Sequence, residues 1–554
     1  MKRFIALLAL VFAVLFVFNA CSCVVTIGDI EIVTDDESKQ TETDPATDPV
    51  TDPEPELSLA ERYPDALTFD ELTTTKTAVR YGDWRLSTPT GDEPIKALVI
   101  YISFTDGHTI DKALFEDRFA GEYDYDNCIR SLASYYHYNS YGKVTFDFTF
   151  LYYESNMTCE EAWHYIHDED ENGHFYGNQY LFDVFNEIKA ENKAGIDYKS
   201  LDGDGDGYID VTYFITGEDL SKTKPGKTGY WLYGPAMGST NNNEYRPNME
   251  DPTLKHFVKA DYENLSQEPD SSKTQICGIR NILHETGHAL GLEDYYDAAA
   301  LEGFPVLATL GCFDMMAYDA GDHDAFSKFA LGYIEPYVVE GIEDEITIRM
   351  SVSEDHDDVI LIPTSKGWNG TAFDEYILID ICAPVGATGF DWGRTMYIYD
   401  NPQGGVRIYH VDARLMHYEK NEETGEYEYV FLDDANDAVK YEGINVNHAF
   451  YNSLNQDIVI NGEKQSQYYH LVEIVPSDKD ETAYRKGAGI HNIMIFNTQD
   501  LFGPGQTFST KYNRAFTNVP FMNNGGTLDY SVTVEAYDAV AHEAVVTIKK
   551  LPTT

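Results

Sequence analysis

Basic residues are scarce in this 554-residue sequence, in which 39 lysines and arginines face 94 aspartates and glutamates, for a formal net charge of −55. A chain this acidic repels the phosphates of DNA and RNA instead of neutralising them. It is also poorly suited to adsorb on an anionic membrane surface. The charge therefore argues against nucleic acid as a partner, while an apolar content of 43% is ample for a folded core.

Cysteine is also scarce. The chain has seven cysteines, of which five follow Cys23 at irregular spacings. An odd number without a regular pattern predicts no disulfide framework. We interpret Cys277 and Cys312 as buried free thiols, and a bridge between these two residues is the alternative.

Long apolar runs are absent after the N-terminus. The single run, Phe4 to Phe18, follows Lys2 and Arg3. Its fifteen residues would rise about 22 Å as a helix, which is less than the roughly 30 Å hydrocarbon core of a membrane. The sequence therefore predicts an export signal over residues 1–20 and no permanent transmembrane anchor.

The junction of Ala20 and Cys21 is typical of a bacterial lipoprotein signal, in which the cysteine carries a lipid. Residues 21–58 form an acidic linker with the tripeptide TDP at residues 43, 47 and 51. Like charges and prolines keep such a segment extended. We predict a protein anchored by Cys21 outside a bacterial cell, with free secretion as the alternative.

The segment ILHETGHALGLED carries the chemistry of a metal site. On a helix, His284 and His288 lie on one face, roughly 5–6 Å apart at Cβ, with Glu285 beside them. Gly291 can end the helix and bring Asp294 under the metal as a third ligand. Three protein ligands and one open position are the arrangement of a catalytic zinc ion.

A methionine-containing segment follows this motif. In metal peptidases of the metzincin type, a methionine turn lies beneath the ligands, and a tyrosine two residues later can face the metal. Met316 and Tyr318 have this spacing. Tyr318 is therefore predicted to donate a hydrogen bond to the oxyanion of the tetrahedral intermediate.

Several segments in the same order resemble one known family. ALVIYISFTD, SLASYYHYNSYGKVTF, the zinc motif and GGVRIYHVD are similar to segments of the immune inhibitor A family of secreted bacterial metallopeptidases. The resemblance extends from about Leu98 to about Arg414. It implies a metzincin-like zinc peptidase, exported from a bacterium.

The chain departs from this family after the zinc helix. The family usually has a Pro-Asp pair there, whereas this chain has Glu293 before Asp294. We predict Asp294 as the third zinc ligand, with Glu293 and Asp297 as the alternatives.

The segment DGDGDGYID predicts a calcium loop over residues 202–210. Asp202, Asp204, Asp206 and Asp210 supply carboxylates, and Tyr208 supplies a carbonyl oxygen. Carboxylates this close repel one another unless a cation neutralises them. The segment is not a complete EF-hand, because the run VTYFI that follows it indicates a strand instead of a helix.

The second half of the chain is rich in strand patterns, among them ITIRMSV, LDYSVTV and AVVTIKK. We therefore predict an α+β protein. A metzincin-like zinc peptidase domain would occupy residues 59–340, and a β-rich, sandwich-like region would occupy 341–554.

These patterns together indicate a zinc endopeptidase with a structural calcium ion, acting on extracellular proteins or peptides. Glu285 would serve as the general base that takes a proton from the zinc-bound water. A catalytically silent surface-binding lipoprotein that keeps the peptidase fold is the alternative. It is disfavoured because Glu285, His284 and His288 are all present.

Overall fold

A computed structural model gives the fold of residues 59–62 and, with internal gaps, 93–552. The gaps are 123–128, 169–176, 224–231, 241–244, 268–277, 296–309, 311–312, 319–320, 343, 394–403, 421–426, 433–445, 449–458, 461–462, 465–469, 478–500 and 511–521. Leu59–Thr554 forms one compact unit. The predicted signal, linker and Cys21 lie outside the described residues.

The first half of the described chain is built on a five-stranded sheet with the order β2-β1-β3-β5-β4. Its strands are β1 (Ile95–Ser103), β2 (Phe146–Glu154), β3 (Val211–Thr216), β4 (Ala236–Ser239) and β5 (His256–Asp261). Neighbouring strands are parallel except at one edge, where β4 runs antiparallel to β5.

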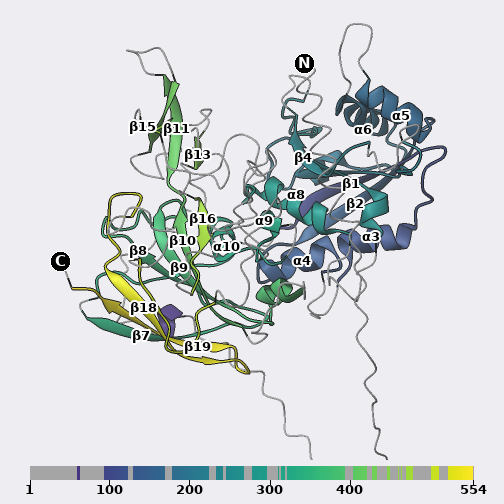
Figure 1. Cartoon of the computed structure of the whole chain (residues 1–554). Helices are drawn as coiled ribbons and strands as arrows, with labels where there is room; N and C mark the ends of the chain where they lie inside the picture. Colours follow the sequence, from purple (N-terminus) through teal and green to yellow (C-terminus); the bar gives the residue numbers. More distant parts are fainter. Residues whose placement is uncertain are drawn as a thin grey trace, which may run out of the picture. The chain divides into compact units, whose positions relative to one another are not determined.

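Helices cover both faces of this sheet (Figure 1). On one face lie α3 (Lys112–Ala120), α4 (Leu132–Asn139) and α8 (Arg280–Leu290), and on the other lie α5 (Cys159–His167) and α6 (Gln179–Glu191). The short helices are α2 (Leu59–Arg62), η3 (Tyr198–Leu201), α7 (Tyr262–Leu265), α9 (Met315–Tyr318), α10 (Ala325–Ala330) and η5 (Ala387–Gly393). Coverage of both faces is the usual requirement of a parallel sheet.

The sequence of β1 explains how it serves both faces. Successive side chains of a strand point to opposite sides. Val99 and Tyr101 belong to the core that includes α8, whereas Leu98 and Ile100 belong to the core that includes α5 and α6. An unbroken apolar run therefore suits this central strand better than an alternating pattern would.

The second half is mostly strand. One sheet has the order β16-β10-β9-β8-β6, a second β17-β18-β19-β7 and a third β13-β11-β12-β14-β15. The strands of the first are β6 (Tyr337–Val338), β8 (Ile360–Pro363), β9 (Glu375–Cys382), β10 (Gly405–Asp412) and β16 (Val472–Ile474). Those of the second are β7 (Glu345–Ser351), β17 (Thr507–Phe508), β18 (Tyr530–Asp538) and β19 (Glu543–Lys550). Those of the third are β11 (Leu415–Lys420), β12 (Tyr427–Phe431), β13 (Val446–His448), β14 (Val459–Ile460) and β15 (Glu463–Lys464).

The first two of these sheets share one hydrophobic core. Ile377 and Ile408 come from the first sheet, and Ile348, Val532 and Val546 come from the second. These two sheets therefore pack through one shared set of buried side chains.

Another core continues across residue 340, where the sequence placed a domain boundary. It contains Leu283 of α8 and Phe329 of α10 together with Tyr376 of β9 and Tyr409 of β10. The rings of Phe329 and Tyr376 are 6.3 Å apart. The two halves are thus packed through shared buried side chains, and helix α8, which carries the zinc motif, belongs to this shared core.

The described chain has both helices and several sheets, as the predicted α+β class requires. The strand patterns ITIRMSV, LDYSVTV and AVVTIKK correspond to β7, β18 and β19. Among the described helices, none has the length and apolarity needed to cross a membrane. Cys159 and Cys382 are buried free thiols, and Cys277 and Cys312 lie outside the described residues.

Candidate metal centre

Helix α8 positions the histidines of the predicted zinc motif. Ile282, Leu283 and Leu290 are buried in the core, so one side of the helix is fixed against the sheet. The helix ends at Gly291, whose φ of 107° lies in the left-handed region. Glycine adopts this conformation without the steric cost of a Cβ atom. The chain turns back there, and Leu292 donates its N–H to the Gly287 carbonyl at 2.9 Å.

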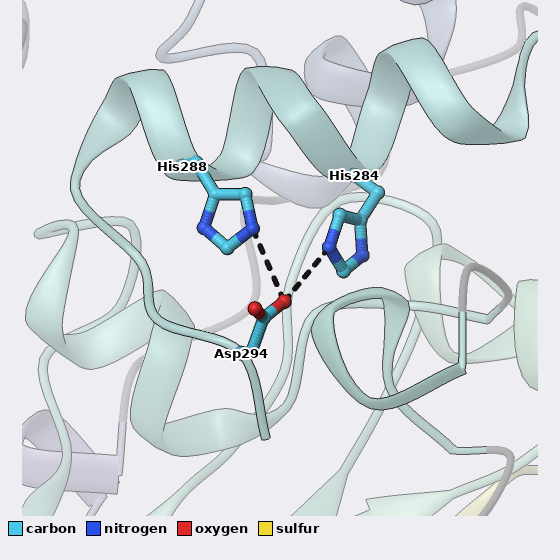
Figure 2. Close-up of side chains that lie close together, drawn as sticks. All are labelled: His284, His288 and Asp294. Carbon is cyan, nitrogen blue, oxygen red and sulfur yellow. Dashed lines mark hydrogen bonds and ion pairs between the residues drawn. The ribbon is translucent and has the colours of Figure 1, made fainter. Parts of the chain in front are cut away.

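Three side chains converge beside this turn (Figure 2). The Nε2 atom of His284 is 3.0 Å from Oδ1 of Asp294, and the Nε2 atom of His288 is 3.1 Å from the same oxygen. His284 and His288 come from α8, whereas Asp294 comes from the segment after Gly291. The residues are a group whose ligand atoms all lie within 4.8 Å of one another.

The other ring nitrogens have partners that fix the tautomers. Nδ1 of His284 donates to the Met315 carbonyl at 3.0 Å, and Nδ1 of His288 donates to the Leu292 carbonyl at 2.9 Å. A neutral histidine with its proton on Nδ1 presents a lone pair at Nε2. Two such lone pairs point at one carboxylate oxygen of Asp294, and three electron-rich atoms repel one another at this distance. The arrangement therefore requires either extra protons or a metal ion between them. The donor set, two imidazoles and a carboxylate, fits a zinc ion with an open position.

Burial and charge agree with a site at the edge of the core. The side chain of His284 is 6% exposed, whereas that of Asp294 is 40% exposed, so the group is open to solvent on the Asp294 side. Burial alone would raise the pKa of Asp294, but hydrogen bonds to His284 and His288 hold that pKa well below its usual value. Burial lowers the pKa of His288, and the contact with Asp294 more than reverses this.

Glu285 is tied to the antiparallel edge strand of the sheet. Its Oε2 atom accepts a hydrogen bond from the backbone N–H of Met237 in β4 at 2.6 Å. Burial raises the pKa of Glu285, against the opposing effects of His284 and His288. A carboxylate with a raised pKa next to this group of side chains is suited to accept and return a proton.

The predicted methionine turn lies directly beneath α8. Met315 and Met316 are fully buried in α9, and the Met315 carbonyl holds His284. A Cβ atom placed on Gly287 would lie 2.4 Å from the sulfur of Met316. The Met316 carbonyl also accepts a hydrogen bond from the N–H of Tyr295, directly after Asp294, at 3.1 Å. The turn therefore contacts both the helix and the segment that carries Asp294.

The structure does not place Tyr318, Asp297 or Glu293 in this group of side chains, for two different reasons. Tyr318 is the last residue of α9, but its side chain lies outside the described part of the structure. Asp297 also lies outside the described residues. Glu293 is described, and it does not belong to the group that Asp294 forms with the histidines.

The predicted calcium loop brings three carboxylates together. Asp202, Asp204 and Asp210 each offer an oxygen within 4.8 Å of the others. Asp210 is fixed by the N–H groups of Gly203 at 2.7 Å and Lys96 at 2.8 Å. Burial, with smaller contributions from the charges of Asp204 and Asp202, raises the pKa of Asp210 to about 6. A divalent cation would relieve this repulsion.

The other two residues of the predicted loop play a different part. The N–H of Asp206 donates to Oδ1 of Asp202 at 3.0 Å and to Oδ1 of Asp204 at 3.1 Å. The Asp206 carboxylate accepts the N–H of Tyr208 at 2.9 Å and is not in the three-carboxylate group. Asp206 thus shapes the turn in this structure through its backbone and its own side chain.

A further group was not found from the sequence. His108, Asp219 and Glu263 follow β1, β3 and β5 and lie within 4.8 Å of one another. His108 and Glu263 are 3.0 Å apart, and Asp219 pairs with Lys222 at 2.9 Å. These contacts already pair the three side chains, so we assign no ion to the group. The residues are far apart in the sequence, and no spacing could have indicated their proximity.

Comparison of the whole chain with models of known protein families and with curated proteins found no match to either.

Proposed function

We propose that the chain is a zinc-dependent endopeptidase with a metzincin-like catalytic unit. The observation that carries the proposal is the convergence of His284, His288 and Asp294 on one point, with both Nδ1 protons held by backbone carbonyls. Two further features support it. Glu285 lies next to the group, and the methionine turn lies beneath the helix.

In this mechanism, His284, His288 and Asp294 would hold a zinc ion. A zinc ion held there would lower the pKa of a coordinated water towards neutrality and polarise the peptide carbonyl. Glu285 takes the proton of the attacking water and returns it to the leaving amine. Because the Met237 N–H occupies Oε2, we assign the proton transfer to Oε1. We assign Tyr318 as the donor to the oxyanion, from its position at the end of α9.

The proposal extends to a calcium ion and to a location outside the cell. Asp202, Asp204 and Asp210 would hold calcium with further oxygen ligands. The N-terminal signal and Cys21 would export the chain and anchor it at a bacterial surface. Its substrates would be extracellular proteins or peptides.

Metal removal tests the proposed reaction. The purified mature chain should contain about one zinc ion and cleave members of a peptide library. A zinc chelator should abolish cleavage, and one equivalent of zinc, but not magnesium, should restore it. Metal content and mass spectrometry of the peptides measure both effects. A zinc-loaded chain that cleaves no peptide would favour the silent surface-binding protein instead.

Calcium should raise the melting temperature of the protein by about 3 °C when its concentration is about 100 times the dissociation constant, because it binds only the folded loop. Asp210→Asn should lose this response, since it removes a carboxylate from the group. Asp183→Asn, at an aspartate of α6 outside the loop, is the control and should keep it. Differential scanning calorimetry decides, and equal responses of the two variants would contradict the assigned site.

Cys21→Ser should release the protein into the medium if the cysteine carries a lipid, because the anchor is then absent. Immunoblots of cell and medium fractions from wild type and variant measure the release. Equal distribution of the two would indicate ordinary secretion.

A further inference from the structure

The tautomer of one proposed zinc ligand depends on a backbone carbonyl outside its helix. Nδ1 of His284 donates to the Met315 carbonyl at 3.0 Å. If this carbonyl moves, the ring of His284 loses the partner that keeps its proton on Nδ1 and its lone pair on Nε2. The position of Met315 is therefore part of the metal site, although Met315 is not a ligand.

Met315 is held by the segment that follows the methionine turn. Its N–H donates to the Asp322 carbonyl at 2.9 Å. The carboxylate of Asp314 clamps the same segment, because it accepts the N–H groups of Met316 at 2.6 Å, Ala317 at 3.0 Å and Asp324 at 2.8 Å. The turn and the segment thus form one hydrogen-bonded unit.

A chain of hydrogen bonds attaches this unit to the β-rich half of the protein. The N–H of Asp322 donates to Oδ1 of Asp391, in η5, at 3.0 Å. Nη1 of Arg407, in β10, donates to Oδ2 of Asp391 at 2.9 Å. The remaining edge of the Arg407 guanidinium donates to Asp380 of β9 at 3.0 and 2.7 Å.

These groups are shielded from water. Arg407, Asp380 and Asp322 are each 0% exposed, and Asp391 is 3% exposed. Buried charged hydrogen bonds hold their geometry more tightly than exposed ones, since water offers no competing partner. The two strands therefore provide a rigid support for Asp391.

Four hydrogen bonds in series run from β10 to the zinc site: Arg407 to Asp391, Asp322 to Asp391, Met315 to Asp322 and His284 to Met315. We propose that Asp391 and Arg407 are positioning residues of the metal centre, so that the β-rich half completes the site instead of forming a separate module. The inference rests on the proposed zinc peptidase function.

A purely structural role would also make these residues important, because removing one partner of a buried ion pair destabilises any protein. The chain offers a matched control. Asp412 lies in β10, as Arg407 does, and is 0% exposed. Its carboxylate pairs with Arg414 at 2.7 Å and accepts a hydrogen bond from Asn523 at 2.9 Å. These described contacts of its carboxylate do not lead to the methionine turn.

The experiment measures zinc affinity in the full mature chain, by competition with a chromophoric chelator, and the absorption spectrum of the cobalt(II)-substituted protein. Asp391→Ala should weaken zinc binding about tenfold and change the cobalt spectrum. Asp412→Ala should lower the melting temperature yet leave affinity within about twofold of wild type. Asp391→Asn, which keeps an oxygen for the Asp322 N–H, should restore most of the affinity lost in Asp391→Ala.

All measurements are made where near-ultraviolet circular dichroism shows the variants to be folded. If Asp391→Ala does not fold, Arg407→Lys replaces it, because lysine cannot bridge Asp380 and Asp391 as the guanidinium does. The inference is overturned if the Asp391 or Arg407 variant binds zinc as tightly as the Asp412 variant. A wild-type chain that binds zinc but cleaves no peptide would overturn the proposed peptidase function, while the affinity series would still decide the positioning role.

Discussion

Replacement of Glu285 by glutamine should lower peptide cleavage by about 10²–10⁴-fold while zinc content stays near one ion per chain. The amide keeps the size of the side chain and can still accept the Met237 N–H through its oxygen. It cannot take a proton from water at neutral pH, so the loss falls on catalysis and not on metal binding. The rate constant kcat and the metal content, measured on the same preparation, separate the two.

Glu293→Gln is the control for this experiment. Glu293 carries the same charge and lies close in sequence, but it is outside the group of metal-binding residues. Its replacement should leave cleavage nearly unchanged. Full activity in Glu285→Gln would rule out the proposed general base.

Loss of Asp294 should remove zinc and activity together. Asp294→Ala leaves His284 and His288, and two ligands are too few for tight zinc binding. It also removes the oxygen that both Nε2 atoms approach at 3.0 and 3.1 Å. Zinc content after dialysis against a weak chelator should fall to near zero, and cleavage should fall with it.

Two companion variants identify the third ligand without ambiguity. Glu293→Ala and Asp297→Ala should keep most of their zinc under the same dialysis. A zinc-replete Asp294→Ala beside a zinc-free Glu293→Ala or Asp297→Ala would assign the ligand to a different carboxylate. Asp297 is included because it is one of the alternative ligands predicted from the sequence and lies outside the described residues.

The core of the candidate site could be predicted from sequence because its parts are local. His284, His288 and Asp294 lie within one helix and the turn after it, so helical spacing and the glycine at 291 determine their approach. The same holds for β3, because the run VTYFI consists mostly of β-branched and aromatic residues and directly follows a turn signal. Short-range rules suffice where the interacting residues are neighbours along the chain.

Other features could not be predicted because they depend on long-range packing. Asp322, Asp391 and Arg407 are far apart in sequence, and their contacts appear only once η5 and β10 are placed against the methionine turn. The partner of Glu285 is a backbone N–H, which every residue except proline possesses, so Met237 carries no distinguishing signal.

The calcium loop shows an intermediate case. Alternating aspartates and glycines indicate a cluster of carboxylates, and Asp202, Asp204 and Asp210 do come together. The repeat does not reveal which of the carboxylates lies outside the cluster. In the structure this is the carboxylate of Asp206, which accepts the N–H of Tyr208. The backbone N–H of Asp206 instead donates to the carboxylates of Asp202 and Asp204.

The close approach of Gly287 to Met316 limits the size of the side chain that the motif accepts before its second histidine. A Cβ atom at residue 287 would meet the Met316 sulfur at 2.4 Å, so even alanine would require the Met316 side chain to move. Because this sulfur lies near the end of a flexible side chain, a change of rotamer can make room for one methyl group. A bulky residue at position 287 needs more room than that, and a protein that carries one would need a smaller residue than methionine beneath its helix.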